Sequence, residues 1–290
     1  VYRYDEAWNR KEIFSGKQKG VYAINADQEG NIWIGTKGDG LRIFPKNGEP
    51  GEPNWAYLLS ADTNAGENNI YAILRDAKGR MWIGTFGNGL FLCEWESGQL
   101  KTKAFPAISK IQKQVRCFLQ DSAGRIWAGG ENGAVLFQPD SLLGNDEAFE
   151  WYYFDRNNPE SLNNNIVKTV FEDHQQQIWL GTSGGGLNLA VENRLSGKFT
   201  FKHYSSENGL TNNIVQAILE DDNHFLWIST ESGLSKFNPD EDLFENFNFT
   251  DTWNSDYFLE SVALKRKTGE LLFGNYNGVY VIDPLSFEKS

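Results

Sequence analysis

The feature that most constrains the fold of this chain is a tryptophan motif that returns at a nearly constant interval. The motif is an apolar run with a central Trp, followed by Gly-Thr or a variant and a glycine-rich loop, as in NIWIGTKGDGL and RMWIGTFGNGL. It recurs every 45 to 52 residues, and its central positions are Trp33, Trp82, Trp127, Trp179, Trp227 and, with Leu in place of Trp, Leu272. A period of about 40–50 residues is typical of propeller blades and too long for ankyrin or tetratricopeptide repeats.

Each repeat contains four short runs that suit strands. In the second repeat the runs 70–76, 81–85 and 90–95 alternate with the turn sequences AKGR and FGNG, and residues 100–105 supply a fourth run. Short runs bounded by Gly and Asp indicate strands, and no segment sustains a helical period of apolar residues. We therefore predict an all-β fold, a β-propeller of four-stranded blades.

Two further residue types recur beside the tryptophan. An Asp stands six positions before it, at Asp27, Asp76, Asp121, Asp173 and Asp221. A Gly stands three positions before it, at Gly30, Gly79, Gly124 and Gly269. The carboxylate can accept backbone N–H groups of the first hairpin turn, and Gly supplies the positive φ that such a turn requires. We expect the tryptophans to lie buried between neighbouring blades, so the motif indicates scaffold and not a ligand site.

The number of blades depends on how the first residues are interpreted. VYRYD at 1–5 resembles the third strands of later repeats, which predicts a half blade over 1–15 ahead of six repeats. We predict one propeller domain over 1–290, seven-bladed with the first blade incomplete. The alternative is a six-bladed ring closed by the N-terminal strand. No apolar stretch is long enough to span a bilayer and no signal peptide begins the chain, and the start at Val1 suggests a processed product or an excised fragment.

Two long runs carry a resemblance to a known family. NNNIVKTVFEDHQQQIWLGTSGGGL and ENGLTNNIVQAILEDDNHFLWISTESGLSKFNP resemble two-component regulator propeller repeats, and the tail 269–284 is similar to the last blade of such sensors. The resemblance implies the periplasmic sensor of a Bacteroidetes hybrid two-component system, in which two propellers and a β-sandwich precede a membrane helix, a histidine kinase and a response regulator. It also implies detection of an oligosaccharide, with the neighbouring propeller and β-sandwich of the receptor, and a second copy of the chain, as partners.

Charge and cysteine content narrow the partners. The net charge is −12, so we expect no binding to nucleic acid and no direct contact with anionic membranes. Cys93 and Cys117 lie in different repeats, and two cysteines do not make a disulfide framework, so we expect buried free thiols.

The sequence shows no constellation that suits catalysis. No pair of carboxylates stands out for acid and base roles, and Arg80 and Arg125 fall in turns at the end of the blades opposite the loops that follow the Trp motif. His174 and His224 fall in equivalent turns of neighbouring repeats, where surface turn residues are expected. The glycine loop at 183–186 lacks the Lys-Ser/Thr of a phosphate loop. We predict no enzyme activity, no cofactor and no metal site.

A ligand is expected where the repeats differ. The position four residues after each Trp falls in the loop between the second and third strands, and it is occupied by Lys37, Phe86, Glu131, Ser183, Glu231 and Tyr276. In a propeller these loops share a face with the crossovers into each first strand, which contain the pairs Asn68-Asn69, Asn164-Asn165 and Asn212-Asn213 and the aromatic stretch 250–258. Asn pairs either satisfy turn backbone or bind a ligand, and both interpretations stay open.

The predicted ligand site follows from this face. Trp253 lies in a polar crossover, which suits stacking on a sugar, with amides bonding to hydroxyl groups. The candidate ligand-binding residues are Trp253, Tyr276, Phe86, Asn164, Asn213 and Lys37. The rival hypothesis is that this face packs on a neighbouring propeller, so that the domain is a platform for protein interaction or dimerisation and not a sensor.

Overall fold

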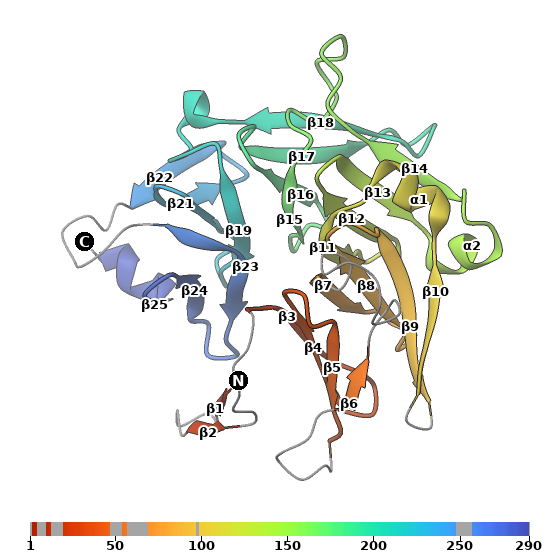
Figure 1. Ribbon diagram of the computed structural model, residues 1–290. Coiled ribbons are helices and arrows are strands. Elements are labelled where there is room, and N and C mark those ends of the chain that lie inside the picture. The colour runs from red at the N-terminus through yellow and green to blue at the C-terminus, as the bar shows by residue number, and fades with distance from the viewer. Residues whose placement is uncertain are drawn as a thin grey trace. The chain divides into compact units, whose positions relative to one another are not determined.

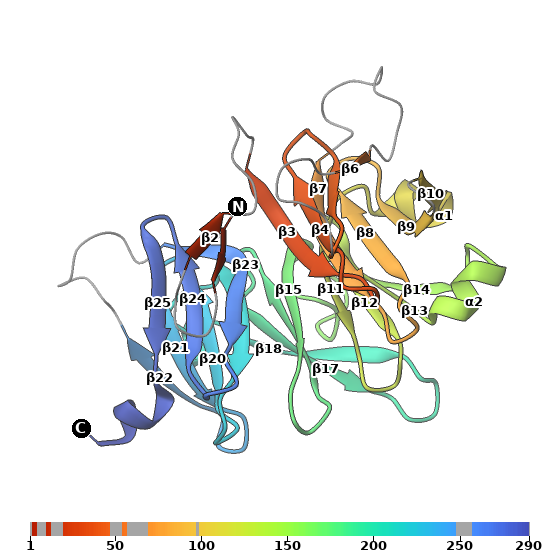
Figure 2. The same cartoon turned by 90° about the horizontal axis from the view of Figure 1, so that it is seen from below.

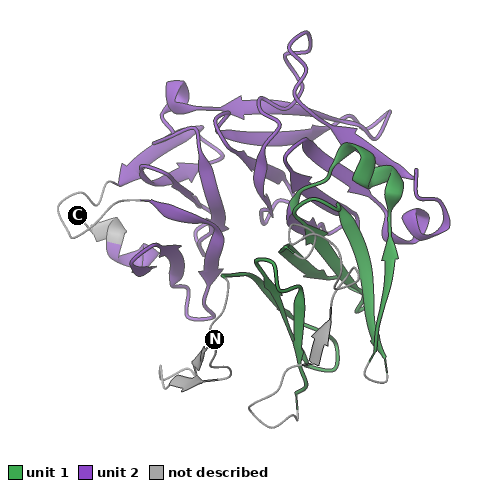
Figure 3. Cartoon of the chain, in the orientation of Figure 1, with its two compact units in different colours: residues 1–115 green, residues 116–290 purple. Residues whose placement is uncertain are grey.

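The computed structural model of the chain is built almost entirely of antiparallel sheets (Figure 1). It describes residues 2–4, 10–12, 20–46, 54–56, 69–96, 99–247 and 257–289. Two compact units are distinguished, residues 1–115 and residues 116–290 (Figure 3).

Unit 1 contains two four-stranded sheets and one pair of strands. The pair joins β1 (Tyr2–Tyr4) to β2 (Arg10–Glu12). Blade 1 consists of β3 (Val21–Ala26), β4 (Ile32–Thr36), β5 (Leu41–Phe44) and β6 (Asn54–Ala56). Blade 2 consists of β7 (Ile70–Arg75), β8 (Met81–Thr85), β9 (Leu90–Glu96) and β10 (Gln99–Ala104), and it is followed by α1 (Pro106–Ile111).

Unit 2 contains four further sheets, the first of which starts at the boundary residue. Blade 3 consists of β11 (Val115–Gln120), β12 (Ile126–Gly130), β13 (Gly133–Phe137) and β14 (Phe149–Tyr152), with α2 (Pro139–Gly144) before its last strand. Blade 4 consists of β15 (Val167–Glu172), β16 (Ile178–Thr182), β17 (Leu187–Glu192) and β18 (Phe199–Tyr204), and it is followed by the 3-10 turn η1 (Ser206–Asn208). Blade 5 consists of β19 (Val215–Glu220), β20 (Leu226–Thr230), β21 (Gly233–Asn238) and β22 (Leu243–Phe247). Blade 6 consists of β23 (Phe258–Lys265), β24 (Leu271–Asn275) and β25 (Gly278–Ile282), and it is followed by η2 (Pro284–Lys289).

The chain is therefore an all-β propeller, as predicted. Within the described residues six sheets carry the repeat, so the blade count of the six-bladed alternative is confirmed and the expected count of seven blades is wrong. The N-terminal strand β1 pairs with β2, and the closure of the ring by this strand stays a prediction. The two short helices were not expected. Both begin with a proline in the first helical turn, Pro106 and Pro139, where its fixed φ and missing N–H suit a helix start.

The recurring aspartate has two roles, of which the sequence indicates one. In the turn of blade 4, Oδ1 of Asp173 accepts the backbone N–H of Gln177 at 2.9 Å, as expected for a turn carboxylate. Its Oδ2 accepts the indole N–H of Trp179 at 2.7 Å. The same indole bond links Asp27 to Trp33, Asp76 to Trp82, Asp121 to Trp127 and Asp221 to Trp227. Blade 6 has neither partner, because Arg266 and Leu272 stand at the two positions.

Four of the repeat tryptophans, Trp33, Trp127, Trp179 and Trp227, pack against the blade that follows them. Trp127 of blade 3 lies in a buried cluster with Val167 and Ile178 of blade 4, and Trp179 lies with Val215 and Ile228 of blade 5. All five repeat tryptophans are at most 1% exposed, which confirms the scaffold interpretation.

Glycine in the motif allows the blades to approach closely. A Cβ on Gly181 would run into the side chains of Val215 and Thr169. The first strands β15, β19 and β23 contact one another on the inner side of unit 2, and Figures 1 and 2 show the sheet β23–β25 beside the sheet of blade 5.

The two thiols lie in the interior of their units. Cys93 and Cys117 are both buried and unoxidised, as predicted. Burial raises the pKa of both thiols, that of Cys117 to about 12.

Among the helices of the described residues, none is long and apolar enough to cross a membrane.

Candidate ligand-binding face

The loops after the Trp motif lie beside the crossovers into the first strands, as the repeat pattern predicts. In unit 1 the backbone N–H of Phe86 donates to the carbonyl of Asn69 at 2.9 Å. In unit 2 the N–H of Ser183 donates to Ile166 at 2.9 Å, and that of Glu231 donates to Ile214 at 3.2 Å. In blades 2, 4 and 5, loop and crossover therefore form one continuous face.

The asparagines of the crossovers serve the turns with their oxygens. Oδ1 of Asn164 accepts the N–H of Ile166 at 2.8 Å, and Oδ1 of Asn213 accepts the N–H of Ser206 at 2.7 Å. The carbonyl of Asn213 also receives the N–H groups of Gly184 and Gly186 at 2.9 and 2.8 Å. Both side chains are half-buried, and their amide N–H groups make no hydrogen bond within the part of the chain that the structure describes. These donors remain available to a ligand.

The other predicted site residues are distributed over the two units. Lys37 is exposed, and its backbone N–H donates to the carbonyl of Gly20 at 2.9 Å in unit 1. Tyr276 follows β24 in unit 2 and is 77% exposed. Trp253 lies outside the described residues. The structure thus places Lys37 and Phe86 in unit 1 and Asn164, Asn213 and Tyr276 in unit 2.

An aromatic row that the sequence analysis missed lies on unit 1. Tyr22 and Tyr71 stack with ring centroids 4.4 Å apart, and Tyr71 lies 5.2 Å from Phe86. Both tyrosines occupy the second position of a first strand, in β3 and in β7. The signal that could have found them is this shared repeat position, because first strands of adjacent blades are neighbours.

The same repeat position carries a polar group in unit 2. Arg116 of β11 binds Glu260 of β23 with 3.1 Å between Nη1 and Oε1, and Nζ of Lys168 in β15 lies 3.8 Å from Oε2 of Glu260. Nζ of Lys168 also donates to Oε1 of Gln216 in β19 at 3.1 Å. We call Arg116, Lys168, Gln216 and Glu260 the inner-strand cluster. The side chains of Arg116, Lys168 and Glu260 are only 12–26% exposed.

The chemistry of the inner-strand cluster suits binding to oxygen atoms. Two cations face one carboxylate, so the cluster retains positive charge in a chain of net charge −12. Guanidinium, ammonium and amide groups together offer several donors to hydroxyl or carboxylate oxygens. Sequence reasoning missed this cluster because Arg116 and Glu260 are 144 positions apart and meet only when the first strands of unit 2 are placed side by side.

Comparison with known proteins bears on the repeats and on the fold. The family model described as two component regulator propeller matches residues 15–38, 65–87, 109–132, 161–184 and 209–232. No curated protein matches the chain in sequence.

Several solved structures share the fold at low sequence identity. The extracellular domain assigned to the hybrid two component system BT3049 of B. thetaiotaomicron is 22% identical, with a TM-score of 0.58 over 95% of this chain and 40% of that one. PorZ, a surface component of the type-IX secretion system of Porphyromonas gingivalis, is 18% identical, with a TM-score of 0.67 over 93% of this chain and 40% of that one. Virginiamycin B lyase from Staphylococcus aureus is 12% identical, with a TM-score of 0.63 over 91% and 84%.

The chain thus spans about 40% of the length of the first two of these relatives. At these identities the likeness shows the fold alone. The five family matches each cover a first strand and the Trp motif that follows it, which are the elements that build the blades. The chain is thus a propeller with five repeats that match the two component regulator propeller model.

Proposed function

We propose that this propeller is the ligand-sensing part of a receptor of the hybrid two-component type, that it acts in the periplasm, and that its ligand is an oligosaccharide. The observation that carries the proposal is a contrast between two parts of the repeat. The residues that build the blades stay constant, whereas the side chains at one position of the first strands vary. The Asp–Trp turns repeat from blade to blade, whereas the second residue of each first strand changes from tyrosine in unit 1 to Arg116, Lys168 and Gln216 in unit 2.

A sugar is a ligand class that suits either kind of group. Its apolar ring face stacks on aromatic side chains, which the row Tyr22, Tyr71 and Phe86 offers in unit 1. Its hydroxyl groups accept from and donate to amides and charged groups, which the inner-strand cluster offers in unit 2. Support for a receptor role comes from the family and from the likeness to an extracellular domain assigned to a hybrid two component system.

We expect binding without turnover. Glycoside hydrolysis needs two carboxyl groups flanking the scissile bond, one as acid and one as base or nucleophile. The inner-strand cluster contains a single carboxylate, and Glu260 is engaged by Arg116 and Lys168. The histidine kinase that would report the bound state belongs to the cytoplasmic part of such a receptor.

The test is a glycan array probed with the full chain, followed by calorimetry with each oligosaccharide that is retained. Tyr71→Ala tests the aromatic row of unit 1 and Lys168→Met tests the inner-strand cluster of unit 2, and at least one of the two should weaken a retained ligand. The array sample analysed afterwards should show intact glycan. Absence of binding to every class on the array, or equal affinity in both variants, would reject the sensing role. Release of shorter sugars would reject the expectation of no turnover.

A second candidate function is a platform for protein interaction, and one surface favours it. Leu264, Leu272 and Val281 stand in cross-strand register on β23, β24 and β25. Leu264 is 60% and Val281 is 49% exposed, and Val262 and Val279 extend the same exposed side of the sheet. Five apolar side chains on one sheet face are typical of a surface that another protein covers.

Sedimentation of the full chain over a range of concentrations tests the platform. Leu264→Lys should reduce association if this face joins two copies. The control is Leu195→Lys, since Leu195 is fully exposed in the turn after β17 and lies away from the sheet face. A monomer at all concentrations would argue against dimerisation through blade 6.

A further inference from the structure

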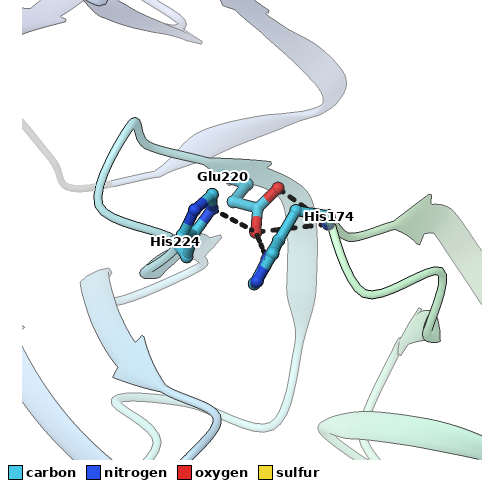
Figure 4. A group of neighbouring side chains, drawn as sticks. All are labelled: His174, Glu220 and His224. Carbon is cyan, nitrogen blue, oxygen red and sulfur yellow. Dashed lines mark hydrogen bonds and ion pairs between the residues drawn. The ribbon is translucent and has the colours of Figure 1, made fainter.

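Two histidines and one glutamate meet on the first-hairpin turns of blades 4 and 5, at the opposite end of β16 and β20 from the loop face. His174 belongs to the turn after β15, and His224 belongs to the turn after β19. The imidazole rings stack with centroids 3.6 Å apart and 19° between their planes. Glu220, the last residue of β19, lies against both rings (Figure 4).

The glutamate has a structural reason to be there. Its carboxylate accepts the backbone N–H of His174 at 3.0 Å and approaches Nδ1 of His174 at 2.5 Å. The preceding blades show the same contact without histidine, because Glu172 accepts the N–H and the hydroxyl of Ser122. A serine therefore suffices for this contact between neighbouring blades, so the contact alone does not explain why histidines stand here.

His224 is the residue that the repeat explains least. It occupies the turn position that is Gly30, Gly79, Gly124 and Gly269 in four other repeats, and its φ is 69°. A side chain in this left-handed conformation costs conformational energy that glycine avoids, although His tolerates it better than most residues. Its ring points to Glu220, with 3.5 Å between Nδ1 and Oε1. Residues held in such unfavourable conformations concentrate at functional sites.

We propose that His174, Glu220 and His224 bind one divalent transition-metal ion, of which Zn²⁺ is the representative. One ligand atom from each residue lies within 4.8 Å of the others. Two imidazoles and one carboxylate form a ligand set that zinc uses, and a water molecule can complete the four positions. Imidazole nitrogen also suits Ni²⁺ and Cu²⁺, so the donor set selects this class of metal over Ca²⁺ or Mg²⁺.

Binding requires only a local adjustment. A metal ion lies near the plane of each imidazole that holds it, so one of the stacked rings must turn. His224 has the room, since 55% of its side chain is exposed, whereas Glu220 is 13% exposed and fixed by its bonds to His174. Because the ligands come from two blades, the ion would hold the turns of blades 4 and 5 together. The site is separate from the proposed sugar site and does not depend on it.

The test is calorimetric titration of the full chain with Zn²⁺, together with the melting temperature and the visible spectrum with Co²⁺. The wild type should bind one equivalent, gain thermal stability and show the absorption of Co²⁺ with nitrogen and oxygen ligands. His224→Gly restores the glycine of the other turns, so it should fold normally and bind Zn²⁺ at least about tenfold to a hundredfold more weakly, the cost known for perturbed metal sites.

Two control variants separate metal binding from effects on the turn. Gln176→Gly makes the same backbone change in blade 4, where Gln176 has a φ of 64°, and should leave Zn²⁺ affinity unchanged. His203→Gln changes the remaining histidine, which lies elsewhere and contacts the carbonyl of Ser161, and should also leave it unchanged. Undetectable binding of Zn²⁺ and Co²⁺ by the wild type, or equal affinity in His224→Gly, would overturn the proposal and leave the group as a contact between blades.

Discussion

Asp173 and Trp179 form a single structural device, because one carboxylate closes the turn with Oδ1 and holds the buried indole N–H at 2.7 Å with Oδ2. The bond fixes the orientation of the indole that packs against the next blade. The two residues are also absent together, since blade 6 has Arg266 and Leu272 in their places. If only one of the two residues were replaced, the other would be left without its hydrogen-bond partner.

The first prediction concerns this pair. Asp173→Ala should lower the free energy of unfolding by about 1–3 kcal/mol, because it removes the acceptor of a buried indole N–H and of two backbone N–H groups of the turn. Urea denaturation measures the change. The neighbouring Gln175→Ala, at an exposed position in the same turn, should stay within about 0.5 kcal/mol of the wild type. If Trp179→Phe removes the orphaned donor, its cost in the Asp173→Ala background should be smaller than in the wild type, and additive costs would contradict the coupling.

The second prediction concerns the close approach of blades 4 and 5. Gly181→Ala should destabilise the chain by about 1–3 kcal/mol, because the added methyl group meets Val215 and Thr169. Val215→Ala in the same chain should recover part of the loss by making room. Thermal melts of the two single variants and the double variant provide the comparison. A double variant that loses the full sum of both single effects would show that the contact with Val215 is not the cause.

The third prediction is a dependence on pH. The pKa of Asp242 is held below its usual value by hydrogen bonds from Lys202 at 2.7 Å and Tyr204 at 2.6 Å. A lowered pKa in the folded state contributes stability above the usual carboxyl pKa, and this contribution is lost as the pH falls through the folded value. The advantage of the wild type over Asp242→Asn should therefore be present near neutral pH and disappear in acid. Since the pair is half-exposed, the difference should stay below about 1 kcal/mol.

Chemical denaturation of both proteins at a series of pH values checks this prediction. Asn suits the left-handed backbone at this position, where φ is 55°, so the substitution leaves the turn intact. The two proteins share all other carboxylates, so the contributions of these groups cancel when the two free energies of unfolding are subtracted. A difference that grows as the pH falls would have the wrong sign and would reject the assignment.

The fourth prediction tests the loop face directly. Tyr276→Ala should weaken oligosaccharide binding by a few-fold to about a hundredfold if Tyr276 stacks on the ligand, since buried aromatic contacts at binding hot spots contribute about 1–4 kcal/mol. The melting temperature should not change, because the side chain is 77% exposed. Leu285→Ala removes a comparably exposed apolar side chain after the last strand and serves as the control. Calorimetry with a glycan retained on the array gives both affinities, and an unchanged affinity in Tyr276→Ala would remove this tyrosine from the site.

The repeat frame could be predicted from the sequence because each of its features is local. A turn Asp, a turn Gly and a buried Trp lie within six residues of one another, and they specify a hairpin without knowledge of the rest of the chain. The helix at Pro106 could not be predicted in this way. Six residues are too few to show a helical period, and its start depends on a proline that is equally suited to a turn.

The candidate site was harder to predict because its members come from different repeats. Lys168 and Glu260 come close only where β15 and β23 are neighbours on the inner side of unit 2. The position within a repeat identifies the second residue of each first strand. It does not show which charged side chains of different blades lie next to one another. The sequence predicts the loop position of Phe86 but not its partner Tyr71. Tyr71 stands in an apolar strand, where a tyrosine that stacks on a neighbouring ring cannot be distinguished from a core residue.

The packing of Trp33, Trp127, Trp179 and Trp227 on the following blade gives these blades a direction along the chain. A gene segment that encodes one blade encodes both sides of this contact. It specifies the surface that packs against the tryptophan of the preceding blade, and it specifies the tryptophan that packs against the next blade. Duplication or deletion of one such segment therefore creates no new kind of interface, since the joint at either end is the one already present between Trp179 and Val215. Blade number can therefore change in evolution by whole repeats. A segment boundary between the aspartate and the tryptophan of one motif would separate the two residues.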